Sequence, residues 1–151
     1  MLNMFREVEL ESLYVPQTAN GTDTTKTSSA CDMRGYEGGL FVIYYGASLD
    51  TLGVAVAIEA ALWECETEGG TYTLVADADV VSDVDDQDNA FGEINVTGED
   101  SNLYYLSYIG DVRYVKVVVT LTGIHTNGTP LCVLACKKLP RLMLTGGRVD
   151  P

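Results

Sequence analysis

The chain has 151 residues, 46% of them hydrophobic, and its 9 Lys+Arg against 22 Asp+Glu give a net charge of −13. This length suits one domain with a real core, and the hydrophobic content excludes wholesale disorder. An acidic chain repels phosphate backbones and anionic lipids, so we expect neither nucleic-acid nor membrane binding. No apolar run approaches the ~20 residues of a membrane span, and the acidic start MLNMFREVELESLY is unlike a signal peptide.

The charge is distributed unevenly along the chain. Between Gly35 and Val112 there is no Lys or Arg, yet this stretch holds 16 of the 22 acids. After Asp111, six basic residues face a single acid, Asp150. This arrangement predicts a polarised surface, or segments that pair across subunits; an acidic soluble protein with scattered counter-charges is the simpler alternative.

The N-terminal residues 1–28 are predicted to form an extended arm. Their sequence VPQTANGTDTTKTSS is polar, rich in turn formers and free of periodic apolar residues. Such an arm could lie along a neighbouring subunit or remain a disordered tail. We place a single folded domain at residues 29–142 and an irregular tail at residues 143–151.

Two early segments of the domain predict strands. Residues 40–45, LFVIYY, are apolar on both faces, which is typical of a strand that is covered on both sides. Residues 54–65, VAVAIEAALWEC, fit either a helix or a strand by periodicity and composition. The turn formers Glu66 to Gly70 follow directly, and this favours a strand–turn–strand hairpin.

The clearest strand pattern lies in residues 114–122, where apolar and polar residues alternate. The alternation predicts a buried face and a face toward solvent or a partner; the first comprises Val115, Val117, Val119 and Leu121, and the second Lys116 and Thr120. After it, Asn127-Gly128 between two β runs predicts a hairpin, with Leu131–Lys138 as the returning strand. Six to eight short strands with little helix predict an all-β fold, an antiparallel β-sandwich.

The cysteines do not indicate a metal site. There are four of them, without CxxC spacing, and one histidine: Cys31, Cys65, Cys132, Cys136 and His125. Cys132 and Cys136 share one face of a predicted strand but lie too far apart along it to form a disulfide. Free thiols in a reducing compartment are expected, and a Cys31–Cys65 bridge stays open as an alternative.

No motif predicts an enzyme. The chain lacks GxSxG, P-loop and GxGxxG spacings, and a histidine in a hairpin loop is poorly placed as a catalytic base. Asp83, Asp85 and Asp88 offer oxygen ligands for Ca²⁺, but the glycine and the closing acid of an EF-hand loop are missing. We therefore interpret this loop as solvated charge, with weak Ca²⁺ binding as the alternative, and expect no cofactor.

A tyrosine cluster precedes the valine-rich strand at Tyr104, Tyr105 and Tyr108. Packing within the core and between strands is one interpretation of these rings. A contact surface for carbohydrate or protein is the other, because tyrosines are enriched at such surfaces.

An ordered series of short motifs resembles a known group of proteins. The series runs Asp32-x-x-Gly35-Tyr36, Gly46-Ala47, Gly70-Thr71-Tyr72-Thr73, Val75-Ala76-Asp77, Tyr108-Ile109-Gly110, Arg113-Tyr114-Val115 and Leu139-Pro140-Arg141. Over about residues 29–142 it resembles small tailed-bacteriophage virion proteins, encoded among head genes, that include capsid decoration (cement) proteins. The chain departs from that pattern in an acidic insert at 83–100 and in its alanine-rich strand.

The resemblance implies a jelly-roll-like sandwich that sits on the assembled capsid, often as a homotrimer at a local threefold position. It implies the major capsid protein as partner and the virion surface as location, after synthesis in the host cytoplasm. We expect contacts to acidic capsid or neighbour surfaces from the basic residues Arg113, Lys116, Lys137, Lys138 and Arg141. A head–tail joining or tail protein, and a carbohydrate-binding sandwich, remain the alternative functions.

Overall fold

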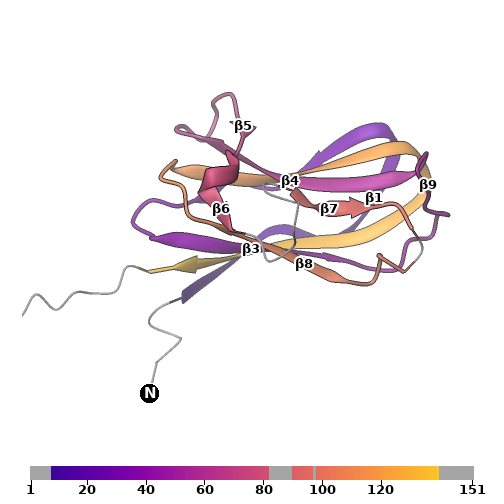
Figure 1. Ribbon diagram of the computed structural model, residues 1–151, viewed down its shortest axis with the longest axis horizontal. Coiled ribbons are helices and arrows are strands. Elements are labelled where there is room, and N and C mark those ends of the chain that lie inside the picture. The colour runs from indigo at the N-terminus through magenta and orange to yellow at the C-terminus, as the bar shows by residue number, and fades with distance from the viewer. Residues whose placement is uncertain (1–7, 82–89, 97, 140–151) are drawn as a thin grey trace, which may run out of the picture.

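The computed structural model describes residues 8–81, 90–96 and 98–139, and within these ranges the regular secondary structure is almost entirely β-strand, with no α-helix (Figure 1). The strands are β1 (Val8–Thr27), β2 (Cys31–Asp32), β3 (Gly38–Tyr45), β4 (Ala57–Cys65), β5 (Thr73–Leu74), β6 (Val80–Val81), β7 (Ala90–Ile94), β8 (Leu103–Tyr108) and β9 (Tyr114–Lys138). One short 3-10 helix, η2, covers Asp77–Asp79.

The strands form one antiparallel sheet that curls into two facing layers (Figure 1). In layer I, residues 114–122 of β9 pair with β4, and β5 and β7 pair with the far side of β4. In layer II, residues 131–138 of β9 pair with β3, which is followed by β8 and β6. The predicted all-β, sandwich-like antiparallel fold is therefore confirmed.

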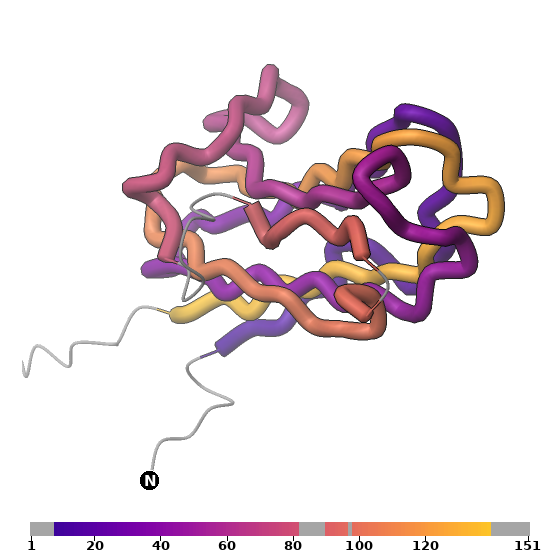
Figure 2. Tube along the Cα trace, turned by 45° about the vertical axis from the view of Figure 1, so that its right-hand side comes forward, coloured from indigo at the N-terminus to yellow at the C-terminus, as the bar shows by residue number. Residues whose placement is uncertain are grey.

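β9 belongs to both layers, because its 25 residues bend from one layer into the other. β1 follows it through the bend, pairing from Val8 with Lys138 to Thr27 with Val118. Figure 2 shows the indigo β1 and the orange β9 turning together at the right-hand end. The hairpin predicted at Asn127-Gly128 is wrong, since the pairing with β1 holds on both sides of this dipeptide and makes it a bulge within one strand.

The predicted arm also differs from the structure. Its residues 8–27 are extended, as expected, but they form the edge strand β1 of the chain's own sheet. Leu13 and Ala19 reach the core with 3% and 0% exposure, while the backbone of β1 is fixed by its hydrogen bonds to β9. The polar sequence of this segment suits an edge strand that has one open side.

The core lies between the two layers, and β9 contributes more buried apolar side chains to it than any other strand. The four predicted inward residues, Val115, Val117, Val119 and Leu121, are between 0% and 2% exposed. Thr120 is exposed and Lys116 is half-buried on the opposite face, which confirms the predicted division. Residues 57–65 form a strand and not a helix, with Ile58 and Leu62 fully buried in the core.

His125 lies at the bend of β9 and is 1% exposed, in contrast to the predicted loop position. Its Nε2 lies 3.2 Å from the carbonyl oxygen of Ala57 and 3.1 Å from that of Thr122. Nε2–H is thus the donor to these two carbonyls, so the imidazole is used to join β4 to the bend.

Asp50, in the loop after β3, fixes the bulge of β9. Its carboxylate accepts hydrogen bonds from the backbone nitrogens of Asn127, at 3.0 Å, and of Gly128, at 2.6 Å. A third bond comes from Asn127 Nδ2, at 3.1 Å. Burial would raise the pKa of Asp50, but these hydrogen bonds outweigh it and lower the pKa.

We expect Asp50→Ala to lower the free energy of unfolding by about 1–3 kcal/mol, because it leaves backbone donors at the bulge without an acceptor. Urea unfolding followed by circular dichroism measures this difference. A lowered folded pKa means that the contribution is present above the unfolded pKa of about 4 and is lost as the pH falls through the folded value. If the difference in free energy of unfolding between wild type and Asp50→Ala stays constant from pH 7 down to about pH 2, the Asp50 carboxylate does not stabilise the bulge.

Candidate functional site

The outer face of layer II is apolar, and β3 is at its centre. Phe41, Ile43 and Tyr45 point into the core and are fully buried. The intervening residues Leu40, Val42 and Tyr44 point away from the core and lie at the molecular surface. The sequence predicted cover on both faces of this strand, but the chain itself covers only one.

The neighbouring strands extend this face in rows. Leu40 pairs with Cys136 of β9 and Ser107 of β8, and the row continues to Leu10 and Val81 at the two edges. Two further rows follow: Val42 pairs with Leu134 and Tyr105, and Tyr44 pairs with Cys132 and Leu103. We call the following ten residues the outer apolar face: Leu10, Leu40, Val42, Tyr44, Val81, Leu103, Tyr105, Cys132, Leu134 and Cys136.

Several of these side chains are strongly exposed. Leu10 is 75% exposed, Leu103 is 56% exposed and Val81 is 54% exposed, while Tyr44, Tyr105 and Leu134 are each more than two fifths exposed. None of the ten residues is charged. A contiguous apolar surface of this kind marks a contact surface in a folded protein, since single exposed apolar residues are ordinary but a whole sheet face is not.

The outer face of layer I provides a comparison within the same molecule. Thr25 of β1 lies opposite Thr120 of β9, and Glu59 of β4 lies opposite Glu93 of β7. All four residues are exposed. This row of the outer face of layer I is therefore polar and partly acidic, in contrast to the rows of layer II.

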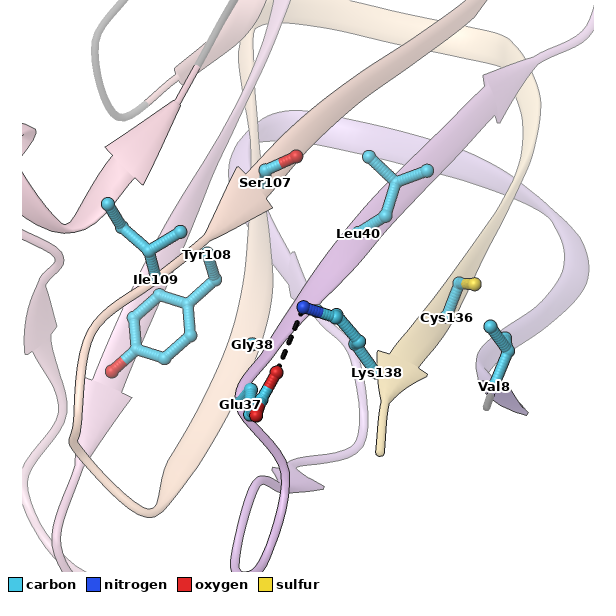
Figure 3. A pocket seen from close by; sticks show the side chains of 10 residues that line it. Val8, Glu37, Gly38, Leu40, Ser107, Tyr108, Ile109, Cys136 and Lys138 are labelled. Atoms are coloured by element: carbon cyan, nitrogen blue, oxygen red, sulfur yellow. Dashed lines mark ion pairs between the residues drawn. The ribbon is translucent and has the colours of Figure 1, made fainter. Parts of the chain in front are cut away.

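A shallow hollow of about 360 Å³ lies at one end of the outer apolar face. Gly38 has no side chain to fill it, and Val8 and Lys138, the paired ends of β1 and β9, border it. Figure 3 shows the Lys138 ammonium directed at the Glu37 carboxylate beside Gly38, at 2.9 Å. The hollow and the described ends of the chain thus occupy the same end of the molecule.

Two of the predicted partner-binding residues are engaged near layer I. Arg113 makes a two-bond ion pair with Asp32, with Nε–Oδ1 at 3.0 Å and Nη2–Oδ2 at 2.8 Å. The hydrogen bonds from this guanidinium lower the pKa of Asp32 to about 2. The ammonium of Lys116 lies over the ring of Tyr72, 3.8 Å from its centroid.

Lys137 is not a surface residue. Its side chain is 6% exposed and lies between the carboxylates of Glu9, at 3.0 Å, and Glu11, at 2.9 Å. Its ammonium also lies 4.6 Å from the centroid of Tyr36, whose hydroxyl donates to Glu9. Burial therefore leaves Lys137 little surface for a partner, and its ammonium instead joins β9 to the two carboxylates of β1.

The five predicted basic residues do not form one patch. Arg113, Lys116, Lys137 and Lys138 each have an anionic or aromatic partner within the chain, and Lys138, at 62% exposure, extends furthest toward solvent. Arg141 lies outside the described residues. Among the four basic residues that the structure describes, Lys138 is the one whose exposure best suits a contact to another protein.

Of the two interpretations of the tyrosine cluster, packing within the core is confirmed for Tyr108, and the contact surface is wrong for this residue. Tyr108 is 0% exposed and donates its hydroxyl to the Glu64 carboxylate at 2.8 Å. Tyr104 is half-buried, packs edge-on against Tyr45 with centroids 5.8 Å apart and donates to the carbonyl of Glu99. Only Tyr105 of the three is exposed, and it belongs to the outer apolar face.

The structure describes all four cysteines but not the three aspartates of the candidate Ca²⁺ loop. Asp83, Asp85 and Asp88 lie outside the described residues; elsewhere in residues 8–81, 90–96 and 98–139 no group of three His, Cys, Asp or Glu could hold a metal ion. The four cysteines are free, and burial raises the pKa of Cys31 to about 12. The described part of the chain has no helix of the length and apolarity that a membrane span requires.

Comparison of the chain with protein-family models, curated proteins and solved structures gave no match. The surfaces of the molecule and the motif resemblance are therefore the observations that bear on function.

Proposed function

We propose that the protein is a non-enzymatic structural protein of a tailed bacteriophage, which binds the outside of the assembled capsid and stabilises it. The observation that supports this proposal most directly is the outer apolar face. An acidic protein that leaves an uncharged sheet face uncovered is suited to a lasting place in an assembly. The motif resemblance supplies the kind of assembly, with the major capsid protein as the partner.

Such a protein acts by mass action and needs no catalytic group. A ligand that binds one state of a shell stabilises this state by RT ln(1 + [L]/Kd) for each site, about 2.7 kcal/mol at 100 times Kd. If the expanded shell displays the site and the unexpanded shell does not, every bound copy favours expansion. Many weak contacts repeated over the lattice then add to a large effect.

The end of the molecule that carries the hollow is our candidate for the contact with the shell. Val8 and Lys138 are paired there, so the segments 1–7 and 140–151 both continue from this point. The sequence of these segments contains Arg6, Arg141 and Arg148 against Glu7 and Asp150. The exposed ammonium of Lys138 lies at this end of the molecule, where it suits an acidic acceptor surface.

Co-sedimentation of the purified protein with expanded and unexpanded capsids tests the proposal. We expect binding to expanded capsids alone, and release as the salt concentration rises well above 0.1 M, where the Debye length falls below about 10 Å. The double variant Lys138→Gln/Arg141→Gln should bind more weakly, whereas Lys26→Gln on β1 should bind as wild type does. Absence of binding to either capsid would overturn the proposal.

Two further outcomes separate the alternatives. If release from the capsid does not depend on salt, the contact is apolar and not electrostatic. Electron microscopy that finds the protein at the tail would replace the decoration role by a joining or tail role. A carbohydrate-binding role has lost most of its support, because Tyr108 is buried and Tyr104 is half-buried.

A further inference from the structure

We propose that two copies of this chain pack against each other through the outer apolar face of layer II, sheet on sheet, about a two-fold axis. The inference deepens the proposed function, since it names the partner of one surface in the assembly. It can be tested on the isolated protein, so its failure and the failure of capsid binding are separate results.

Charge favours a second copy as the occupant of this face. The chain carries a net charge of −13, so most contacts between two copies would bring carboxylates together. The ten residues of the outer apolar face carry no charge, whereas the outer face of layer I presents Glu59 and Glu93. A second copy offers an identical uncharged face, so pairing there avoids this repulsion and needs no charge on the other side.

The size of the face is also sufficient. Five strands, β1, β9, β3, β8 and β6, lie side by side in layer II. With about 4.8 Å between strands and about 6.8 Å between rows of outward side chains, five strands and three rows cover on the order of 500 Å² in projection. With the relief of the side chains this approaches the accessible area of about 800 Å² that each partner buries in a standard interface.

The relief of the face is complementary to itself. Tyr44, 46% exposed, stands near one end of β3, in the row that it forms with Cys132 and Leu103. The hollow at Gly38 and Leu40 lies at the opposite end of β3 (Figure 3). A two-fold axis that lies between the sheets and runs across the strands reverses the strand direction, so it brings Tyr44 of each copy over Leu40, which lines the hollow, of the other.

The same axis places native thiols opposite each other. Leu134 lies midway between Cys132 and Cys136 on the outward face of β9. An axis that passes over the row of Leu134 therefore sets Cys132 of one copy opposite Cys136 of the second copy. Sheets that pack face to face lie about 10 Å apart, so a short bismaleimide can join these two thiols.

Sedimentation equilibrium over a range of micromolar concentrations, with Val42→Glu and Val118→Glu as a matched pair, tests the interface. Both valines are half-buried on central strands, but Val42 lies on the outer apolar face and Val118 on the outer face of layer I. We expect twice the chain mass of 16.3 kDa for wild type and Val118→Glu, and the single-chain mass for Val42→Glu. Circular dichroism establishes that each variant is folded, and the more exposed Leu134→Glu replaces Val42→Glu if that variant unfolds.

The thiol test uses a Cys65→Ser background, in which bismaleimide should link two chains. We expect this product to disappear when either Cys132→Ser or Cys136→Ser is added. A wild-type protein that stays monomeric, a species of three chains, or a dimer that Val42→Glu and Leu134→Glu leave intact would overturn the inference. Monomers that still bind expanded capsids would overturn the inference alone, and dimers that do not bind capsids would overturn the proposed function alone.

Discussion

Replacing Gly123 with alanine is expected to destabilise the fold by about 3 kcal/mol or more. Gly123 lies in the bend of β9 with φ +79°, a left-handed conformation that costs other residues about 1–2 kcal/mol. An added Cβ would also overlap the backbone carbonyl oxygen of Ala55, in the loop before β4. A backbone atom cannot rotate away as a side chain can, so either the loop or the bend must shift, and overpacking of this kind costs a further 1–3 kcal/mol, roughly.

Gly53→Ala is the matched control, because it adds the same methyl group to the loop before β4, the loop that contains Ala55. No atom lies within 4 Å of the position of its Cβ. Urea unfolding of both variants should therefore show a large fall in midpoint for Gly123→Ala and a change within about 0.5 kcal/mol for Gly53→Ala. Equal midpoints for the two variants would show that the bend is not held in the conformation described here.

The bend was the part of the fold that local sequence signals could not predict. Asn127-Gly128 has the composition of a two-residue hairpin turn, and the same residues also suit a bulge with a positive φ at glycine. The choice depends on β1, which pairs with β9 at Ala19 and Gly21 on either side of the dipeptide. Because that partner is more than 100 residues earlier in the chain, no window around the dipeptide contains the information.

The alternation in β9 was predictable because it follows from one local requirement. A strand with one buried face must repeat apolar residues with a period of two, and Val115 to Leu121 satisfy this rule without interruption. β1 carries the weaker signal of an edge strand, in which few side chains reach the core. Leu13 and Ala19 do so, and the polar residues around them predict an arm as readily as a strand.

The candidate site was partly visible in the sequence. The run at 40–45 is apolar on both faces, and the structure shows that the chain covers only its inner face. The basic residues were misleading, because their acidic partners are remote in sequence: Asp32 precedes Arg113 by 81 residues. A charge pattern records how many cations a segment has, but not how many of them the fold has already neutralised.

The second large effect is expected at Lys137, where Lys137→Ala should lower the free energy of unfolding by about 2–4 kcal/mol. The side chain is almost fully buried at the end of the core and neutralises Glu9 and Glu11 of β1. Its removal leaves two carboxylates facing each other beside the buried Cys31 thiol, and it opens space that alanine cannot fill. The first half of β1 should therefore loosen from β9, which amide hydrogen exchange of residues 8–12 would report directly.

Lys138→Ala is the control on the neighbouring position, and its exposed pair with Glu37 should contribute at most about 1 kcal/mol. The pH dependence distinguishes charge from packing at Lys137. Burial would lower the pKa of Lys137, but its bonds to Glu11 and Glu9 outweigh this and raise it, so its contribution is present below the unfolded value of about 10.4 and is lost as the pH rises through the folded one.

The hydrogen bonds from Tyr36 and Lys137 lower the pKa of Glu9, so the carboxylate's contribution is present above the unfolded value of about 4.3 and is lost as the pH falls through the folded one. The difference between wild type and Lys137→Ala should consequently be largest from about pH 5 to pH 10 and should narrow on both sides. Lys137→Met fills the same space without the charge, so it should recover the packing part at every pH. If Lys137→Met were as stable as wild type throughout this range, the ion pairs would contribute nothing, and Lys137 would be only a spacer between β1 and the core.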